Sequence, residues 1–192
     1  MAATSTMLPL GTTAPPFSLP DTVSGRTVSL DDYADNKALL VMFICNHCPY
    51  VKHVRDGLAA LGRDYAGADI GIVAISPNDP TEHPDDSPEA MAAEAKDAGY
   101  VFPYLYDEPQ EVAKAYTAIC TPDFFLFGPD RTLVYRGRMD ESRPNMPLPV
   151  TGEELRAAID AVLADESVAE EQYPSMGCSI KWRPGNAPDY AA

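Results

Sequence analysis

Basic residues are scarce in this sequence, with 14 Lys and Arg against 29 Asp and Glu, a formal net charge of −15. Nucleic acids and anionic membrane surfaces repel a protein of this charge, so neither is expected as a partner. No stretch approaches the roughly 18 consecutive apolar residues of a membrane-spanning helix. The N-terminal residues also show neither the basic region nor the apolar core of a secretory signal. We therefore expect a cytoplasmic protein.

Cysteine is scarce too, with four residues, at positions 45, 48, 120 and 178. This is too few for a small secreted domain held together by disulfides. Internal repeats and low-complexity segments are absent, and the length of 192 residues fits one domain with a tail. We expect a domain over residues 1–165 and a tail over 166–192. The tail is expected to pack on the domain because it carries Cys178 and the only tryptophan, Trp182.

The order of apolar patterns predicts an α/β fold. Residues 38–44 are seven consecutive apolar residues, typical of a strand buried on both faces. After Pro49, apolar residues recur every three or four positions as far as Tyr65, which predicts a helix. Residues 70–75 form a second buried strand. A strand, a helix and a strand in this order are typical of a parallel crossover unit.

Shorter elements are predicted around this unit. The acidic segment 79–97 has seven acids and one lysine, and we interpret it as solvated surface. The other expected elements are two short strands within 15–30, a helix from Ser87-Pro88, a short helix opened by a capping box at 107–110, a hairpin over 124–136, and a helix opened by a capping box of Thr151 and Glu154.

Cys45 and Cys48 stand at the junction between the first predicted strand and its helix. One helical turn brings two such sulfurs within disulfide reach. The helix N-terminus stabilises a thiolate through its free N–H groups and the positive end of its dipole. The pair therefore indicates reversible dithiol–disulfide chemistry.

The charge around the pair agrees with this interpretation. Residues 37–63 hold four basic residues and one acid, a net charge of +3 within the acidic chain. His47 and Lys52 are predicted to tune the pKa of the pair, because a neighbouring cation stabilises a thiolate. For His47, a solvated loop position is the alternative.

Pro49 suggests which cysteine is more acidic. Proline disfavours helical backbone angles in the residue before it, so we expect Cys48 as N-cap and Pro49 as the first helical residue. Cys48 would then face the N–H groups of Tyr50 and Val51. This geometry favours Cys48 as the more acidic thiol.

A zinc site is an alternative explanation of the cysteines. Structural zinc usually uses two close pairs of ligands, whereas Cys120 and Cys178 are isolated in the sequence. No metal is therefore expected, and two thiols at one junction also disfavour inert packing. A non-catalytic binding module whose thiols are structural or hold zinc stays open as an alternative function.

Three segments together, FICNHCPYVKHV (43–54), CTPDFF (120–125) and GCSIKW (177–182), resemble the thioredoxin-like proteins of the peroxiredoxin-like, AhpC/TSA-related group. The resemblance spans roughly residues 8–183. It implies a thioredoxin-like fold, a mixed central sheet flanked by helices, with an N-terminal β-hairpin and an insertion near 77–98. It also implies a thiol-dependent oxidoreductase with an antioxidant role. No metal or organic cofactor is needed, but a thiol electron donor is.

The resemblance assigns roles to further residues. Thr121-Pro122 matches the cis-proline position that faces the cysteine pair of thioredoxins, and Thr121 would offer its backbone to an extended substrate peptide. Cys120 is then either an additional redox thiol or a core residue. Cys178 is either a redox thiol delivered by the tail or a packing residue of the tail.

The two branches of the resemblance differ on the nucleophile, which stays open here. Thioredoxins attack with the first cysteine, here Cys45, and resolve with the second, here Cys48. Peroxiredoxins place the peroxidatic cysteine at Cys48, with Thr or Ser in place of Cys45, and their activating arginine has only Arg136 and Arg138 as candidates. We predict dithiol–disulfide exchange with a disulfide-bearing protein or small thiol. Peroxide reduction at Cys48, resolved by Cys45, is the alternative.

Overall fold

A five-stranded mixed sheet forms the centre of the computed structural model, which describes residues 2–191. Its strand order is β6-β5-β4-β8-β9. Strand β4 (Ala38–Phe43) pairs in parallel with β5 (Ile70–Ser76), which pairs in parallel with β6 (Tyr104–Tyr106). Strand β8 (Asp123–Phe127) is antiparallel to both β4 and β9 (Leu133–Gly137). The predicted parallel unit and the hairpin that follows it are confirmed.

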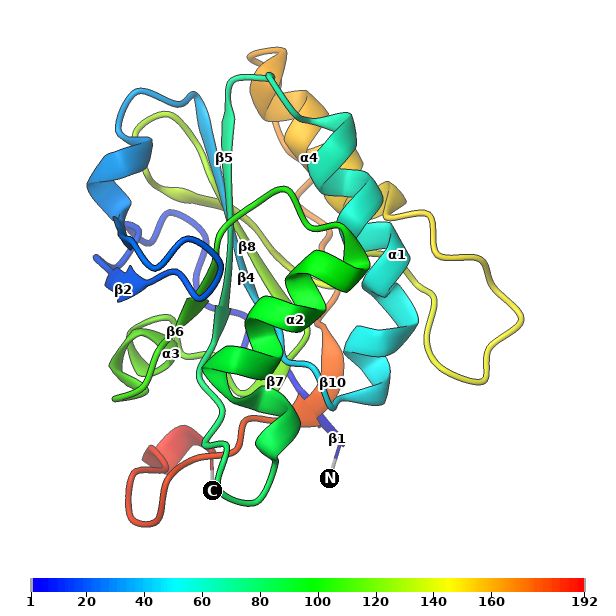
Figure 1. Cartoon of the computed structure of the whole chain (residues 1–192). Helices are drawn as coiled ribbons and strands as arrows, with labels where there is room; N and C mark the ends of the chain where they lie inside the picture. Colours follow the sequence, from blue (N-terminus) through cyan, green and yellow to red (C-terminus); the bar gives the residue numbers. More distant parts are fainter. Residues whose placement is uncertain (1, 192) are drawn as a thin grey trace.

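Helices and a hairpin cover the two faces of this sheet (Figure 1). One face carries α1, α2 and α4, and the other carries α3, the 3-10 turn η1 and the β2/β3 hairpin. The bounds are α1 (Pro49–Asp64), α2 (Pro88–Ala98), α3 (Glu111–Ala115), α4 (Glu153–Leu163), η1 (Leu30–Tyr33), β2 (Ser18–Pro20) and β3 (Thr27–Ser29). Of the helices in this described part, none combines the length and apolar character needed to cross a bilayer.

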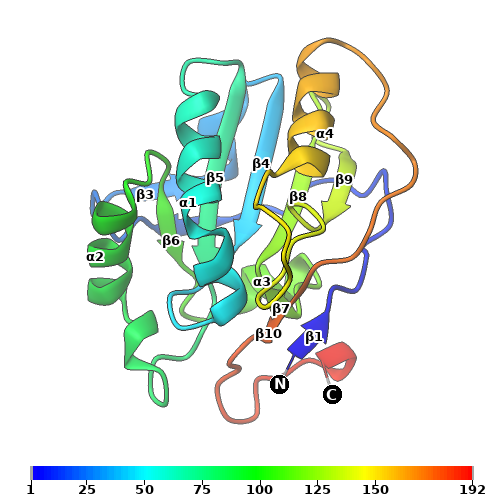
Figure 2. The ribbon, with the colours of Figure 1, turned by 90° about the vertical axis from the view of Figure 1, so that its right-hand side faces the viewer.

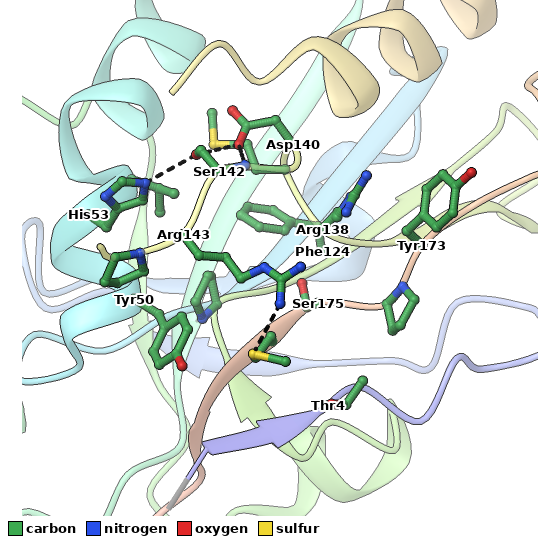
Figure 3. Close-up of a pocket in the computed structure, with 16 residues that line it drawn as sticks. Thr4, Tyr50, His53, Phe124, Arg138, Asp140, Ser142, Arg143, Tyr173 and Ser175 are labelled. Carbon is green, nitrogen blue, oxygen red and sulfur yellow. Dashed lines mark hydrogen bonds between the residues drawn. The ribbon is translucent and has the colours of Figure 1, made fainter. Parts of the chain in front are cut away.

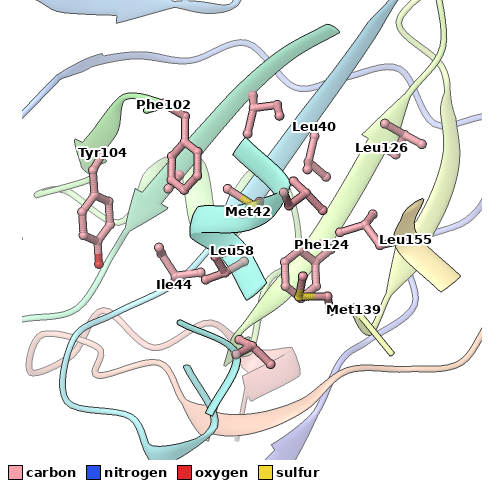
Figure 4. Packing of buried hydrophobic residues seen from close by; sticks show 14 of the residues in the cluster. Leu40, Met42, Ile44, Leu58, Phe102, Tyr104, Phe124, Leu126, Met139 and Leu155 are labelled. Atoms are coloured by element: carbon pink, nitrogen blue, oxygen red, sulfur yellow. The ribbon is translucent and has the colours of Figure 1, made fainter. Parts of the chain in front are cut away.

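The sheet separates two apolar clusters, because successive side chains of a strand point to opposite faces. Leu40 and Met42 of β4 face α1 and α4, where Leu58, Phe124 and Leu155 pack around them (Figure 4). All five are fully buried. Burying a side chain of this size stabilises the fold by about 1.5–3 kcal/mol. Both clusters fix the end of β4, where the cysteine pair begins.

Helix α1 begins as the sequence predicts, with Cys48 as N-cap and Pro49 in the first turn. Cys48 has extended backbone angles, φ −67° and ψ 124°, the conformation that proline favours in the residue before it. The helix ends at Asp64, and Tyr65, the last residue of the predicted apolar pattern, is its C-cap. Its apolar face is buried against the sheet.

The insertion near 77–98 lies between β5 and β6. It consists of a loop, the 3-10 turn η2 (Pro84–Asp86) and α2. Gly99 ends α2 in the left-handed conformation, with φ +72°, which glycine adopts without steric cost. The loop and η2 turn back toward the start of α1, because the backbone N–H of Asn46 bonds to Asp86.

Both predicted capping boxes are wrong. The N-cap of α3 is Gln110 in a left-handed conformation, and the Asp107 carboxylate accepts the N–H of Ala113 in the next turn. The N-cap of α4 is Gly152, and Glu154 forms an ion pair with a distant arginine instead of closing a box. The Asp107 carboxylate thus still caps the first turn of α3, although not through a box with Gln110, whereas Arg138 takes the Glu154 carboxylate.

Both ends of the chain join a second, three-stranded sheet of order β1-β10-β7 (Figure 2). Its strands are β1 (Ala2–Thr4), β10 (Met176–Ser179) and β7 (Cys120–Thr121), all antiparallel. The tail thus packs on the domain and ends in the 3-10 turn η3 (Asp189–Ala191). Strand β1, with three residues, is too short to show a pattern in the sequence.

Two glycines allow the tail to approach this closely. A Cβ on Gly177 would lie 2.0 Å from the carbonyl oxygen of Thr121. A Cβ on Gly137, which has φ +122°, would lie 2.0 Å from the carbonyl oxygen of Tyr173. Only glycine fits at either contact. The tail is therefore built into the fold next to β7.

Candidate active site

The predicted catalytic cysteines lie where β4 ends and α1 begins. Cys45 follows the strand by two residues, and Cys48 is the N-cap of the helix. Both are free thiols and both are buried, with exposed fractions of 1% and 0%. The strand and the helix thus hold the two sulfurs side by side beneath the surface.

Thr121 contacts both sulfurs. Its Oγ1 lies 3.1 Å from Sγ of Cys45, and its carbonyl oxygen accepts a hydrogen bond from the Cys48 thiol at 3.2 Å. The peptide bond between Thr121 and Pro122 is cis, which confirms the position implied by the resemblance. The structure therefore brings together four of the predicted site residues.

The free backbone edge expected at Thr121 is not free. Cys178 of β10 is paired with Thr121, and Ser179 with Cys120, in an antiparallel register. A strand of the same chain thus occupies the position where an extended substrate peptide was expected to pair. The sequence could not show this, because the two strands are more than 50 residues apart along the chain.

The same pairing brings a third thiol to the site. Cys178 is half-buried; it pairs with Thr121, whose carbonyl oxygen contacts the Cys48 sulfur, and it packs against the apolar cluster that contains Cys45 and Cys48. Cys120 lies deeper, and its thiol donates a hydrogen bond to the Pro122 carbonyl oxygen at 3.9 Å. Burial raises the pKa of Cys120 well above its ordinary value, with Asp123 adding to the effect. Cys178 thus joins the pair, whereas Cys120 packs as a core thiol.

The pKa values of the pair diverge. Hydrogen bonds to the thiolate, above all from the Cys45 thiol, lower the pKa of Cys48 to about 5, with Cys178 and the N–H of Val51 as the further donors. The same contact with Cys48, together with burial, raises the pKa of Cys45 well above its ordinary value. Burial and the contact with Cys48 raise the pKa of Cys178 to about 12.

These shifts mark Cys48 as the thiolate of the site. The Thr121 carbonyl oxygen accepts a hydrogen bond from the Cys48 thiol and so favours the protonated form. The hydrogen-bond donors that favour the thiolate outweigh this single contact. The sequence predicted the N–H groups of Tyr50 and Val51 as donors. Of these two, the N–H of Val51 lowers the pKa of Cys48, and the other backbone N–H that lowers it belongs to Cys178 instead of Tyr50. Because the thiolate is the nucleophilic form, this geometry favours Cys48 as the attacking sulfur.

Asp86 is a site residue that the sequence did not reveal. It is fully buried, and its Oδ1 accepts the backbone N–H groups of Asn46 at 2.8 Å and His47 at 3.1 Å. Its Oδ2 lies 2.5 Å from Nδ1 of His47 and accepts from the Asn78 amide at 2.8 Å. The interpretation of segment 79–97 as solvated surface is wrong for this residue, since its carboxylate holds the loop between the cysteines.

Further contacts of the insertion and β6 support the same loop. The His47 ring stacks on His83, with centroids 4.1 Å apart and an interplanar angle of 10°. The Tyr104 hydroxyl donates to the Asn46 side chain at 3.1 Å. Lys52 is exposed on α1, and neither Lys52 nor His47 is among the groups that shift the pKa of the two cysteines. The structure therefore gives His47 a role in positioning the loop.

One group of side chains offers ligand atoms of the kinds that zinc takes. Sγ of Cys45, an imidazole nitrogen of His47 and a carboxylate oxygen of Asp86 lie within 4.8 Å of one another. Zinc would require Cys45 as a thiolate, whereas its pKa is raised. The carboxylate is also engaged by four hydrogen-bond donors. The Asp86 carboxylate therefore has its hydrogen-bond partners without a metal, and the cluster serves to hold the loop between the cysteines.

A pocket of about 290 Å³ opens beside Pro122 (Figure 3). It lies between α1, the loop after β9, and the tail residues that lead into β10. Arg143 points into it and contacts the Met176 sulfur at 3.5 Å. His53 lies on the α1 side, 3.2 Å from the hydroxyl of Ser142. The pocket is cationic on one wall and borders the strand that carries Cys178.

The two arginines considered for a peroxiredoxin-like role are engaged elsewhere. Arg136 bonds to Gln172 and to the Leu8 carbonyl oxygen. Arg138 forms an ion pair with Glu154 at 2.5 Å. Neither guanidinium bonds to a cysteine of the pair, so the site contains no activating arginine of that kind among these two.

Comparison with known proteins agrees with this geometry. The model of the AhpC/TSA family matches residues 10–136. A Mycobacterium tuberculosis protein named as a peroxiredoxin is 34% identical over 115 residues, 59% of this chain and 67% of that protein. The crystal structure of an uncharacterized conserved protein from Geobacillus kaustophilus superposes with a TM-score of 0.94 at 54% identity, covering 96% of this chain and 98% of the other.

A more distant structure identifies the fold. The thioredoxin domain of a thiol-disulfide oxidoreductase from Bacteroides vulgatus superposes with a TM-score of 0.57 at 19% identity, covering 72% of this chain and 91% of that domain. At this identity the likeness concerns the fold alone. The fold is thioredoxin-like, as the resemblance implied.

Proposed function

This chain belongs to the AhpC/TSA family and is a thiol-dependent oxidoreductase, and we propose that it cycles Cys45 and Cys48 between a dithiol and a disulfide. The observation that carries this proposal is the placement of two free, buried thiols against one residue, since Thr121 contacts the Cys45 sulfur with its hydroxyl and the Cys48 sulfur with its carbonyl oxygen. Hydrogen bonding lowers the pKa of Cys48 to about 5 and raises that of Cys45. The site thus holds a thiolate and a proton donor in contact.

Each sulfur has its own step. The Cys48 thiolate attacks a disulfide of the partner, a mixed disulfide forms, and one partner sulfur leaves as a thiolate. Cys48 then no longer carries the charge that held the proton on Cys45. Cys45 loses that proton and attacks the Cys48 sulfur, which closes the Cys45–Cys48 disulfide and releases the second partner sulfur. The chemistry uses sulfur alone, and a thiol donor reverses it.

Peroxide reduction is the second candidate, because Cys48 is an acidic thiol followed by Pro49 at a helix N-terminus. The thiolate would attack a peroxide oxygen to give a sulfenic acid, which Cys45 would convert to the same disulfide with loss of water. The full burial of Cys48 suits a small oxidant. The arginines that bond elsewhere weigh against efficient peroxide chemistry.

Two oxidants separate these candidates. Reduced protein is treated in parallel with one equivalent of hydrogen peroxide and with glutathione disulfide, then quenched by alkylation and mapped by peptide mass spectrometry. We expect glutathione disulfide to produce the Cys45–Cys48 disulfide, and peroxide to react no faster than with a free thiol. Cys120→Ser is the matched control, since Cys120 lies outside the pair. Peroxide reacting far faster with Cys48 would favour the peroxidase, and no Cys45–Cys48 disulfide with either oxidant would overturn both.

A further inference from the structure

The proposed cycle needs a route between a buried disulfide and its partner. Cys45 and Cys48 have exposed fractions of 1% and 0%, so a protein-sized thiol or disulfide cannot approach either sulfur in this conformation, and the partner sulfur that Cys48 attacks must be brought to it by a group nearer the surface. Cys178 is only half-buried and is the most exposed of the three. It pairs with Thr121, whose carbonyl oxygen contacts the Cys48 sulfur at 3.2 Å, and it packs against the cluster that contains Cys45 and Cys48. All three cysteines therefore neighbour Thr121, and the exposed fraction is lowest for Cys45 and Cys48 and highest for Cys178.

The position of Cys178 is fixed by backbone contacts on both sides. Strand β10 pairs with β7 at Thr121 and with β1 at Ala2. Residue 177 must be glycine for this pairing, because a Cβ would lie 2.0 Å from the Thr121 carbonyl oxygen. After the strand, the Ile180 N–H donates to the Ile119 carbonyl oxygen at 2.9 Å. Cys178 is therefore held beside Cys48 by the fold and does not depend on a loose tail.

We propose that Cys178 is a third redox thiol, which exchanges with Cys48 and carries the disulfide between the buried pair and an external thiol. This inference rests on the proposed function, since it requires a Cys45–Cys48 disulfide as the internal end of the relay. It assigns to the tail the place that a substrate peptide was expected to take at Thr121. Strand β10 of the same chain then supplies the sulfur that exchanges with Cys48.

The steps balance without a further oxidant. In the oxidised protein the Cys178 sulfur attacks the Cys48 sulfur; the Cys178–Cys48 bond forms, the Cys48–Cys45 bond breaks, and Cys45 takes the proton that Cys178 loses. An external thiolate then attacks the Cys178 sulfur, and Cys48 leaves as a thiolate. A second external thiol displaces the first from Cys178. Two external thiols become one disulfide and the protein becomes fully reduced.

The chemistry of the three thiols fits this order. A thiol of low pKa leaves most readily in thiol–disulfide exchange, and Cys48 is the sulfur that leaves when the external thiol attacks. In the reduced protein, burial and the Cys48 thiolate raise the pKa of Cys178; once Cys48 is part of a disulfide the second cause is removed, so Cys178 loses its proton more readily when it attacks. When the second external thiol displaces the first, Cys178 leaves and takes up a proton to become a free thiol again. The reverse sequence loads a disulfide from an external partner onto the pair.

Trapping the intermediate tests the relay without altering β10. In Cys45→Ser the last step is blocked, so treatment with glutathione disulfide followed by alkylation and mass spectrometry should give the Cys48–Cys178 disulfide as the main intramolecular species. Cys120→Ser in the same background is the control and should give the same product. Finding Cys48 oxidised only to mixed disulfides with glutathione, with Cys178 alkylated, would overturn the relay.

A second experiment compares reductants of different size on the intact pair. In Cys178→Ser we expect the Cys45–Cys48 disulfide still to form, its reduction by a thioredoxin to slow at least tenfold, and its reduction by dithiothreitol to change less than threefold. Thermal unfolding shows whether the variant is folded. An unchanged rate with thioredoxin would overturn the relay and leave the proposed function intact. A wild-type protein that never forms the Cys45–Cys48 disulfide would overturn both.

Discussion

Asp86 contacts His47 twice, with Oδ1 accepting its backbone N–H at 3.1 Å and Oδ2 lying 2.5 Å from Nδ1 of its ring. The insertion therefore supplies the buried carboxylate that fixes the loop between the cysteines. Buried backbone N–H groups outside regular secondary structure need partners from elsewhere in the molecule. Here a segment 40 residues away satisfies two of them, which ties the insertion to the redox site.

Replacing Asp86 should loosen this loop. Asp86→Asn keeps the shape of the side chain but removes its charge and half of its acceptor capacity, leaving buried donors without partners. We expect the free energy of unfolding to fall by about 1–3 kcal/mol. Urea denaturation measures the loss, and Asp85→Asn, an exposed neighbour, should change stability by less than about 0.5 kcal/mol. Equal effects of the two changes would contradict the role given to Asp86.

The pH dependence of thiolate formation should show one acidic thiol. Hydrogen bonding lowers the pKa of Cys48 to about 5, so Cys48 is protonated below that pH and ionised above it. Thiolate absorbance near 240 nm should rise by one thiolate equivalent through pH 5 in the reduced protein. The pKa values of Cys45 and Cys178 are raised, so no second step is expected below pH 8. Cys48→Ser should remove the acidic step, and its survival in that variant would assign it to another group.

The sequence was most informative where local backbone chemistry decides the structure. Pro49 after Cys48 predicted both the N-cap and the helix start, and the structure has both. The relation of Cys178 to Cys48 and that of Asp86 to His47 could not be read in the same way. Each depends on a contact made through tertiary packing, by a strand of four residues in one case and a 3-10 turn of three in the other. Segments that short have no hydrophobic period to detect.

The hydroxyl of Thr121 should matter for the second step of the cycle. It lies 3.1 Å from Sγ of Cys45 and acts to lower the pKa of that thiol. In Thr121→Val the pKa of Cys45 should therefore rise further, and closure of the Cys45–Cys48 disulfide from the mixed disulfide should slow several-fold near neutral pH. Stopped-flow kinetics with glutathione disulfide measures the closure.

The control for this change is Thr121→Ser, which retains the hydroxyl and should restore the rate of closure. The acidic step of Cys48 should stay near pH 5 in both variants, because the thiolate is held by other donors. A valine variant that closes as fast as the wild type would show that the hydroxyl does not assist Cys45.

Gly177 links the stability of the tail to the acidity of Cys48. A Cβ there would meet the Thr121 carbonyl oxygen at 2.0 Å, so in Gly177→Ala β10 must move away from β7, at a cost of about 1–3 kcal/mol for overpacking. That movement withdraws the thiol and the N–H of Cys178 from the Cys48 sulfur. We therefore expect the acidic absorbance step to move upward by at least one pH unit, together with the loss in stability.

The matched control for the glycine is Gly185→Ala, also in the tail. Gly185 has φ +76° and open space around its Cα, so alanine there should cost only about 1 kcal/mol of backbone strain. The Cys48 step should then stay near pH 5. If Gly177→Ala lowers the stability but leaves the Cys48 step in place, Cys45 and the helix N-terminus alone set its acidity. The contribution assigned to Cys178 would then be wrong, and β10 would serve the site only as a cover.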